Sequence, residues 1–368
     1  MAVTTGRRHF LGAGAALLAQ AALAPPARAQ AAPLAAPTVD TLRVTVLTDS
    51  SYDTPRPGSS RWVKVTRAPF FSGADFRKAL HNEWGLSLAL ESRAGAESRD
   101  FMLDYGYTAQ ALLNNADILG LDVSKVRALI LSHGHYDHFG GLLGFLQQQR
   151  ARLPADLALY VGGEDNFCNR LTRTGTPGHF ADWGVLDRRE LAALKVRVVS
   201  CEQPTVIEGQ AFTTGSIQRR SFERVLPNTL VEYGIKDGLG CDMPAAAAKA
   251  QGKPVPDEHL NEHATCFNIK DRGLVVISSC GHAGIVNTVL QAQEVSGIRK
   301  IHAVVGGFHL FPADDDYLRR TVAELKALDP DVVIPLHCSG PGFAAVMREQ
   351  LPDRLLPSTN GSTFLFGT

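Results

Sequence analysis

One apolar segment of this chain leads directly into an unusually dense cluster of potential metal ligands. Residues 127–131 (Arg-Ala-Leu-Ile-Leu) have the composition of a buried strand, and residues 133–138 read His-Gly-His-Tyr-Asp-His. Neutral imidazole and ionised carboxylate groups are natural donors to zinc and similar divalent metals. A core strand that delivers three histidines and an aspartate into one turn constrains the chain to fold around a metal site.

The same pattern recurs in the second half of the chain. Three more histidines follow apolar segments: His282 after residues 274–278, His309 after residues 301–305 and His337 after residues 331–334. Helices are expected after two of these segments, at about 284–295 and 315–328. Catalytic groups in layered α/β folds sit in loops beyond the carboxyl ends of buried strands. We therefore expect these histidines to converge on one rim.

Local patterns also predict elements in the first half of the chain. Residues 42–48 alternate apolar and polar side chains as a half-buried strand does. Residues 109–119 fit a helix, and Thr108 is suited to be its N-cap.

The donor set favours a catalytic metal over a structural one. A structural zinc site usually has four protein ligands, often thiolates, whereas a catalytic site keeps a position open. The chain has six cysteines but no CxxC pair, so no zinc ribbon can be identified. A disulfide is possible in an exported protein, and the sequence leaves its pairing open.

The first 29 residues have the features of an export signal. Arg7 and Arg8 precede an apolar stretch over residues 10–23, and residues 27–29 (Ala-Arg-Ala) form a small-x-small cleavage pattern. The paired arginines indicate a twin-arginine (Tat) signal peptide over 1–29, followed by a flexible leader over 30–40. The apolar run is shorter than the roughly 20 residues that a membrane span requires. We expect a periplasmic or secreted protein without stable membrane association after cleavage.

The net charge of the chain limits the class of partner, and its length limits the number of domains. The formal net charge is zero, which gives no electrostatic basis for binding nucleic acid and leaves a small molecule as the expected partner. We expect one catalytic domain over 41–368. Residues 234–262 have little periodicity, so this segment is interpreted as an insertion or lid.

Two motifs together suggest a family. The run from His133 to His138 follows Ser132 and precedes two glycines, and residues 102–106 (Met-Leu-Asp-Tyr-Gly) form an apolar strand that ends in Asp and Gly. Both resemble the metallo-β-lactamase superfamily, over roughly residues 40–368. The resemblance implies an α/β fold: an αββα four-layer sandwich of two mixed sheets flanked by helices.

Further segments are similar to a narrower branch of that superfamily, the 7,8-dihydropterin-6-methyl-4-(β-D-ribofuranosyl)aminobenzene-5'-phosphate synthase-like proteins. These segments are residues 83–87, 213–217, 280–287, 306–310 and 335–340.

The resemblance also implies roles for individual residues. His133 and His135 match ligands of a first metal, with His282 as its third ligand. Asp137 and His138 match ligands of a second metal, which His337 completes.

Other residues have supporting or open roles. Asp137 is the candidate catalytic residue, because it can both ligate a metal and orient the attacking hydroxide. Asp104 is suited to hold a ligand histidine from outside the coordination sphere. The superfamily's usual bridging aspartate is missing: Cys280 ends the strand in question, and His309 is the preferred replacement, with Cys280 as the alternative.

The expected function is that of a dinuclear metallohydrolase. Two divalent ions, zinc first and manganese or iron as alternatives, are expected to activate a metal-bound hydroxide that attacks an ester, phosphoester or related small molecule. One alternative is a dihydropterin-type synthase or transferase, or a metal-dependent oxidoreductase, on the same fold. Another is a non-catalytic metal- or ligand-binding protein. The other histidines are expected to be ordinary surface or core residues: His81, His179, His259, His263 and His302.

Overall fold

A computed structural model describes residues 1–3, 33–53, 60–68 and 77–367. One compact unit comprises Pro33–Thr368. The predicted signal peptide lies outside the described residues, apart from residues 1–3. In the described part of the chain, no helix has the length and apolar character needed to cross a membrane.

Alternating and apolar segments, most of them from the first half of the chain, build a mixed sheet of eight strands. In spatial order these are β10 (Arg197–Ser200), β7 (Ala158–Val161), β6 (Val126–Leu131), β5 (Glu97–Leu103), β4 (Ser87–Ala94), β2 (Thr41–Thr48), β21 (Thr363–Phe366) and β3 (Lys64–Thr66). The strands from β10 to β5 pair in parallel, and those from β5 to β3 pair antiparallel.

The second half of the chain supplies most of a mixed sheet of seven strands. Six follow one another in the order β11 (Val206–Ile207), β12 (Ala211–Thr213), β17 (Thr265–Ile269), β18 (Gly273–Ser278), β19 (Ile301–Gly306) and β20 (Val332–Pro335). The seventh, β1 (Thr38–Val39), pairs in parallel with β17. Because β18, β19 and β20 run parallel, their carboxyl ends meet at one edge.

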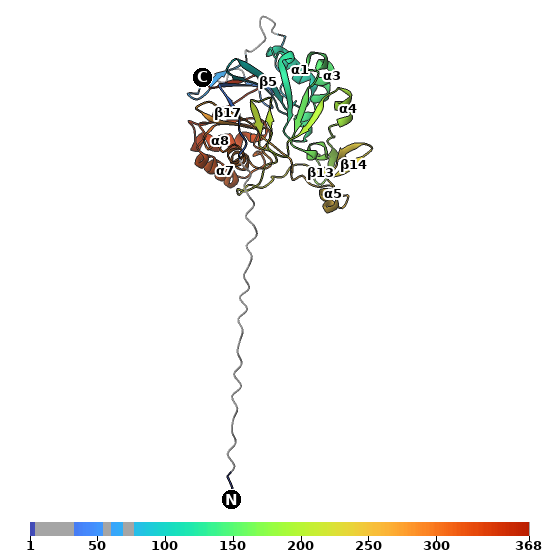
Figure 1. Ribbon diagram of the computed structural model, residues 1–368, viewed down its shortest axis with the longest axis vertical. Coiled ribbons are helices and arrows are strands. Elements are labelled where there is room, and N and C mark those ends of the chain that lie inside the picture. The colour runs from blue at the N-terminus through green and yellow to red at the C-terminus, as the bar shows by residue number, and fades with distance from the viewer. Residues whose placement is uncertain (4–32, 54–59, 69–76, 368) are drawn as a thin grey trace. The chain divides into compact units, whose positions relative to one another are not determined.

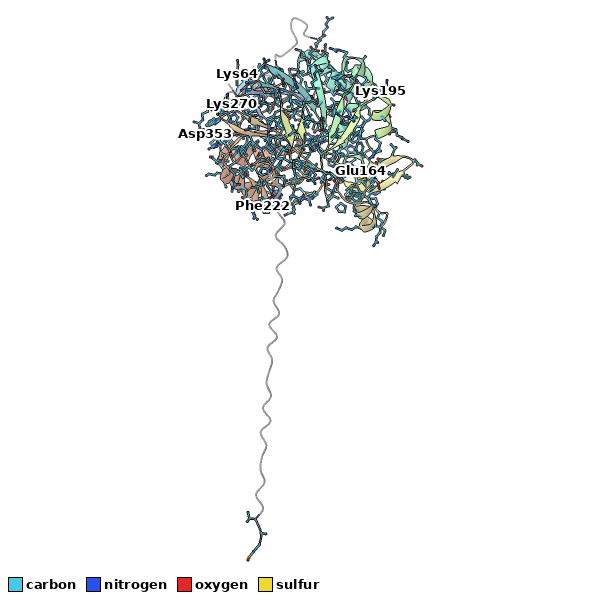
Figure 2. The ribbon with its side chains drawn as sticks, in the orientation of Figure 1. Lys64, Glu164, Lys195, Phe222, Lys270 and Asp353 are labelled. Carbon is cyan, nitrogen blue, oxygen red and sulfur yellow. A yellow bond between two sulfur atoms is a disulfide. The ribbon has the colours of Figure 1, made fainter. Side chains whose placement is uncertain are left out.

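Three apolar layers hold these sheets between helices. Side chains of both sheets pack together, and the rings of Phe101 and Phe267 lie 5.8 Å apart. The outer face of the first sheet packs against α1 (Ala109–Ile118), α3 (Leu142–Gln149) and α4 (Arg188–Ala193). The outer face of the second sheet packs against α6 (Ile285–Ser296), α7 (Asp315–Leu328) and α8 (Gly340–Gln350). Figure 1 shows these helices on opposite sides of the strands, and in Figure 2 side chains fill the space between them. The predicted four-layer α/β sandwich is confirmed.

Local signals placed α1 correctly. Thr108 is its N-cap, and its hydroxyl accepts a hydrogen bond from the Ala111 amide at 3.2 Å. Over residues 33–40 the structure differs from the flexible leader that we expected. Leu34 and Ala36 pack against the apolar layer beside α6, and β1 extends the second sheet. This apolar burial orders residues 33–40, which the alanine- and proline-rich composition conceals.

The segment interpreted as an insertion contains short elements of its own. A hairpin of β14 (Gly234–Lys236) and β15 (Leu239–Cys241) precedes α5 (Pro244–Ala250). β16 (Val255–Pro256) then joins a small antiparallel sheet with β13 (Leu230–Glu232), β8 (Asn169–Arg173) and β9 (Phe180–Asp182). Figure 1 shows β13, β14 and α5 together at one margin of the molecule.

Candidate metal centre

The loops beyond β6, β18, β19 and β20 bring the predicted ligands together. β6 delivers His133 and His135, and the single turn α2 (Tyr136–Phe139) carries Asp137 and His138. Glycine is required at position 134, because a Cβ there would lie 2.6 Å from the Asn166 carbonyl oxygen.

Four buried histidines form the first group of donors: His133, His135, His259 and His282. One ring nitrogen of each lies within 4.8 Å of the others. The rings of His259 and His282 stack at 3.7 Å with an angle of 3° between their planes. The structure thus brings together the three histidines expected at the first metal and adds a fourth.

The second group consists of Asp137, His138 and His337, whose donor atoms again lie within 4.8 Å of one another. Oδ2 of Asp137 lies 3.3 Å from Nε2 of His337 and 3.8 Å from Nε2 of His138. These are the three residues expected at the second metal. His337 and His309 both have left-handed backbone conformations, with φ of 45° each. Such strained conformations are concentrated at functional sites.

The free donor atoms of both groups fit a pair of metal ions. Buried atoms without a hydrogen-bond partner include Nε2 of His133, His138 and His282, Nδ1 of His259, Oδ1 of Asp137 and both ring nitrogens of His337. A buried polar atom without a partner costs about 1–3 kcal/mol. Metal ions bound within the two groups would give these atoms a partner and remove this cost.

Neighbouring polar groups hold the ligand rings in orientation. Nδ1 of His133 lies 2.9 Å from the Ser132 hydroxyl. Nε2 of His135 lies 2.9 Å from the Thr229 hydroxyl. Such contacts select the ring nitrogen that remains available to a metal.

Burial and mutual repulsion keep the first group neutral. Burial, reinforced by the neighbouring imidazoles, holds the pKa values of His133 and His282 well below the usual range. Burial does the same to the pKa of His259, although the Asp257 carboxylate opposes it. For Asp137 burial alone would raise the pKa, but the imidazoles of His138 and His337 outweigh it and hold the pKa below its usual range. Neutral imidazoles and an ionised carboxylate are the forms that bind divalent metals.

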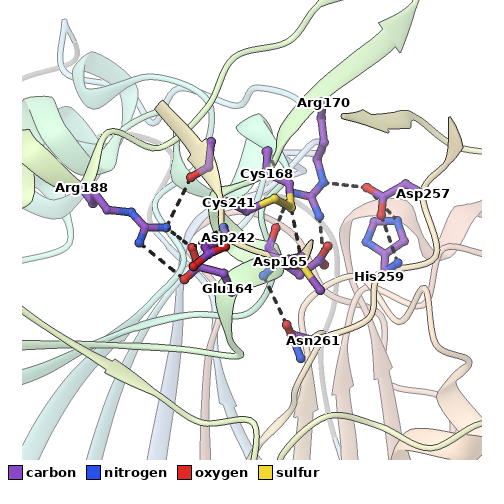
Figure 3. Close-up of a disulfide and its surroundings, with 12 residues drawn as sticks. Glu164, Asp165, Cys168, Arg170, Arg188, Cys241, Asp242, Asp257, His259 and Asn261 are labelled. Atoms are coloured by element: carbon purple, nitrogen blue, oxygen red, sulfur yellow. Dashed lines mark hydrogen bonds and ion pairs between the residues drawn. A yellow bond between two sulfur atoms is a disulfide. The ribbon is translucent and has the colours of Figure 1, made fainter. Parts of the chain in front are cut away.

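A buried ionic network supports the first group from one side (Figure 3). The guanidinium of Arg170 donates to Asp257 at 2.6 Å and to Asp165 at 3.0 Å, and its side chain is fully buried. The Asp257 carboxylate in turn accepts from the His259 backbone amide at 3.0 Å. A disulfide between Cys168 and Cys241 lies beside this network and ties the β14–β15 hairpin to the segment that carries Arg170.

His259, which we expected to be an ordinary histidine, lies within the first donor group. It follows no apolar strand, and it reaches the site from the loop after β16. Its position depends on pairing of β16 with β13 and on its contact with Asp257. The available signal was the run of acids and histidines over residues 257–263.

His309, Cys280 and Cys338 lie beside the two groups. The donor atoms of Cys280, His309 and Cys338 lie within 4.8 Å of one another. Cys280 also forms such a group with His133 and His138.

The site opens onto a cavity of about 540 Å³. Ligands of both groups line its floor, including His135, Asp137 and His337. Its walls carry aromatic side chains and one cation, namely Trp84, Tyr107, Trp183, Phe311 and Arg173. A cavity of this size holds a small molecule.

Comparison with known proteins agrees with this geometry. Residues 95–166 match the model of the metallo-beta-lactamase superfamily. Over 273 residues the chain is 26% identical to the 7,8-dihydropterin-6-methyl-4-(beta-D-ribofuranosyl)-aminobenzene-5'-phosphate synthase of Methanocaldococcus jannaschii, covering 73% of this chain and 84% of that relative. It is also 26% identical over 260 residues to an uncharacterized protein of the same organism, covering 66% and 86% respectively.

A solved structure confirms the fold. The crystal structure of a metal-dependent hydrolase of the beta-lactamase superfamily matches with a TM-score of 0.62 and 22% identity, over 88% of this chain and 98% of that one. Proteins with this fold bind divalent metals, for which the two donor groups are suited. The chain is therefore a metallo-β-lactamase-fold protein that resembles the dihydropterin synthase branch of the superfamily.

Proposed function

We propose that the protein is a dinuclear metal-dependent hydrolase of small-molecule esters or phosphoesters. The observation that carries this proposal is the pair of adjacent donor groups, which hold buried atoms without hydrogen-bond partners and include residues that line a cavity. Divalent ions held there would stabilise charge that develops on a substrate oxygen and would activate water. Zinc is the first expectation, and manganese or iron are alternatives.

The chain's own residues divide the remaining tasks. His133, His135, His259 and His282 would hold one ion, and Asp137, His138 and His337 the other. Oδ1 of Asp137 has no hydrogen-bond partner, and the residue lines the cavity, so this carboxylate can orient the attacking water.

The positive charge of Arg173 in the cavity lining favours an anionic substrate. Its guanidinium Nε donates to the Asn228 carbonyl at 3.3 Å on the cavity wall. Aromatic walls with one cation suit a flat ring that carries a phosphate or carboxylate. Arg173→Gln is expected to raise KM for anionic substrates and leave KM for neutral analogues unchanged.

Metal removal tests hydrolysis directly. Chelator-treated protein should lose turnover on a panel of phosphoester, lactone, thioester and lactam substrates, and zinc or manganese should restore it. Asp137→Asn should lower kcat by about 10²-fold or more, since it removes the carboxylate that holds the second ion and orients the water. Asp156→Asn, at an exposed carboxylate, is the matched control. Full turnover by the metal-free protein would overturn the proposal.

A synthase or transferase reaction is the second candidate. It is favoured by the similarity to a synthase of a pterin- and phosphate-containing compound, together with the aromatic walls and Arg173. Hydrolysis carried out in ¹⁸O-labelled water places solvent oxygen in the product, whereas group transfer to another acceptor does not. Iron in the natively purified protein would instead support an oxidoreductase.

We also propose that the protein works in the periplasm or outside the cell, with a small molecule as its partner. The disulfide between Cys168 and Cys241 supports an oxidising compartment. Fractionation of cells that express the full chain, with and without substitution of Arg7 and Arg8 by lysine, tests export.

A further inference from the structure

Cys280 occupies the space between the two donor groups. Its sulfur and one ring nitrogen each of His133 and His138 all lie within 4.8 Å of one another. His133 belongs to the first group and His138 to the second, and their Nε2 atoms are buried without partners. The Cys280 side chain is only 3% exposed and lines the cavity floor.

His309 has a different position. Among the described residues, it joins a group of three potential donors only with the sulfurs of Cys280 and Cys338. Its Nδ1 lies 3.7 Å from the Cys280 sulfur. The donor that groups with a histidine of each set is thus the Cys280 sulfur. The imidazole of His309 lies beside His282 of the first group, with 4.1 Å between the ring centroids.

Cys338 holds the Cys280 sulfur in place. The two sulfurs are 3.1 Å apart, and the Cys338 sulfur accepts a hydrogen bond from the His309 amide at 3.2 Å. The Cys338 thiol can therefore donate a hydrogen bond to the Cys280 sulfur while the Cys280 sulfur binds a metal ion.

Charge balance favours a further anionic ligand. Two divalent cations would face imidazoles, which are neutral, and the one carboxylate of Asp137. A thiolate bound to both cations would add a second negative charge that stabilises both of them. Thiolate is a soft ligand that selects zinc, cobalt or iron over magnesium or calcium.

We propose that Cys280 is a thiolate ligand shared by the two metal positions, and that Cys338 positions its sulfur by a hydrogen bond. This inference rests on the metal centre proposed above, but not on hydrolysis. Cys280 would take the place of the superfamily's usual bridging aspartate.

Cobalt substitution tests the inference by spectroscopy. Protein loaded with two equivalents of Co²⁺ should show sulfur-to-cobalt charge-transfer absorption in the near ultraviolet. Cys280→Ser and Cys280→Asp should both lose that absorption, while Cys280→Asp should still bind two equivalents because it supplies a carboxylate. Cys338→Ser should keep the absorption at a shifted wavelength. Cys201→Ser, at another buried free cysteine, should leave it unchanged.

Two results would overturn the inference: a doubly loaded wild-type protein without the absorption, or absorption that persists in Cys280→Ser. If the variants fail to fold, alkylation of the wild-type protein decides. Alkylation of Cys280, measured by mass spectrometry, should be slower in the zinc-loaded protein than in the metal-free protein. An unchanged alkylation rate would contradict the inference. Loss of hydrolysis with the absorption intact would reject the hydrolase proposal alone.

Discussion

Oδ2 of Asp104 lies 2.7 Å from Nδ1 of His138, and both side chains are fully buried. The same carboxylate accepts hydrogen bonds from the Ser132 amide at 2.9 Å and the Ser132 hydroxyl at 2.7 Å. Asp104 thereby fixes His138 with Nδ1 protonated and Nε2 turned toward Asp137. The Asp104 carboxylate, directly after β5, thus holds Ser132 and His138 at the two ends of the histidine cluster.

Asp104→Asn is expected to weaken metal binding. The amide cannot accept all three hydrogen bonds, so His138 loses its fixed tautomer and ring orientation. Loss of such a contact typically lowers metal affinity by about 10–100-fold. Competition with a fluorescent zinc chelator measures the effect. Asp117→Asn, on the exposed surface of α1, should leave affinity unchanged. Equal affinities of the two variants would contradict this role of Asp104.

His259→Ala should remove one donor from the first group. Because its Nδ1 is buried without a partner and one of its ring nitrogens lies within 4.8 Å of donor atoms of the other three histidines, its loss should reduce zinc content or affinity. Equilibrium dialysis followed by elemental analysis gives the stoichiometry. His302→Ala provides the control, since that buried imidazole contacts Asp331 at 2.9 Å and belongs to neither donor group. Wild-type zinc binding by His259→Ala would mean that His259 only packs against the site.

Removing the disulfide should lower stability without changing the fold. Cys168 and Cys241 are 73 positions apart, so their bond restricts a long loop in the unfolded chain. Loss of a native disulfide typically costs about 2–5 kcal/mol. Urea unfolding of the Cys168→Ala/Cys241→Ala variant, compared with Cys201→Ala, measures this cost. The unfolding midpoint of wild-type protein should also fall on addition of reductant, and an unshifted midpoint would argue that the bond contributes little.

Asp100 should make stability depend on pH. Burial, and then the carboxylate of Glu91 paired across the sheet, raise its pKa to about 6. The folded state holds this proton more tightly than the unfolded state, so this contribution to stability declines as pH rises from about 4 to about 6. Asp100→Asn should therefore stabilise the protein at pH 7, by about 1 kcal/mol at most because the group is half-exposed.

Thermal unfolding of Asp100→Asn and wild type at pH 4, 5, 6 and 7 tests this linkage. The stability difference should grow with pH and disappear at the acidic end. Asp156→Asn is a suitable reference, because Asp156 is an exposed carboxylate outside the strands. A difference that is constant with pH would show that the substitution acts through packing and not through charge.

The sequence alone determined the features that depend on neighbours along the chain. Apolar segments such as that of β6 identify buried strands, Thr108 marks the start of α1, and the run from His133 to His138 identifies the metal chemistry. These signals are local because strand and helix periodicities and capping involve residues a few positions apart.

Only the tertiary structure decided which distant loops meet. His259 enters the site through pairing of β16 with β13, and the ends of β18 and β19 pack so that Cys280, and not His309, groups with His133 and His138. The pairing of Cys168 with Cys241 likewise depends on where the β14–β15 hairpin folds back. Such contacts join residues far apart in the sequence, and their geometry follows from sheet packing that no local pattern records.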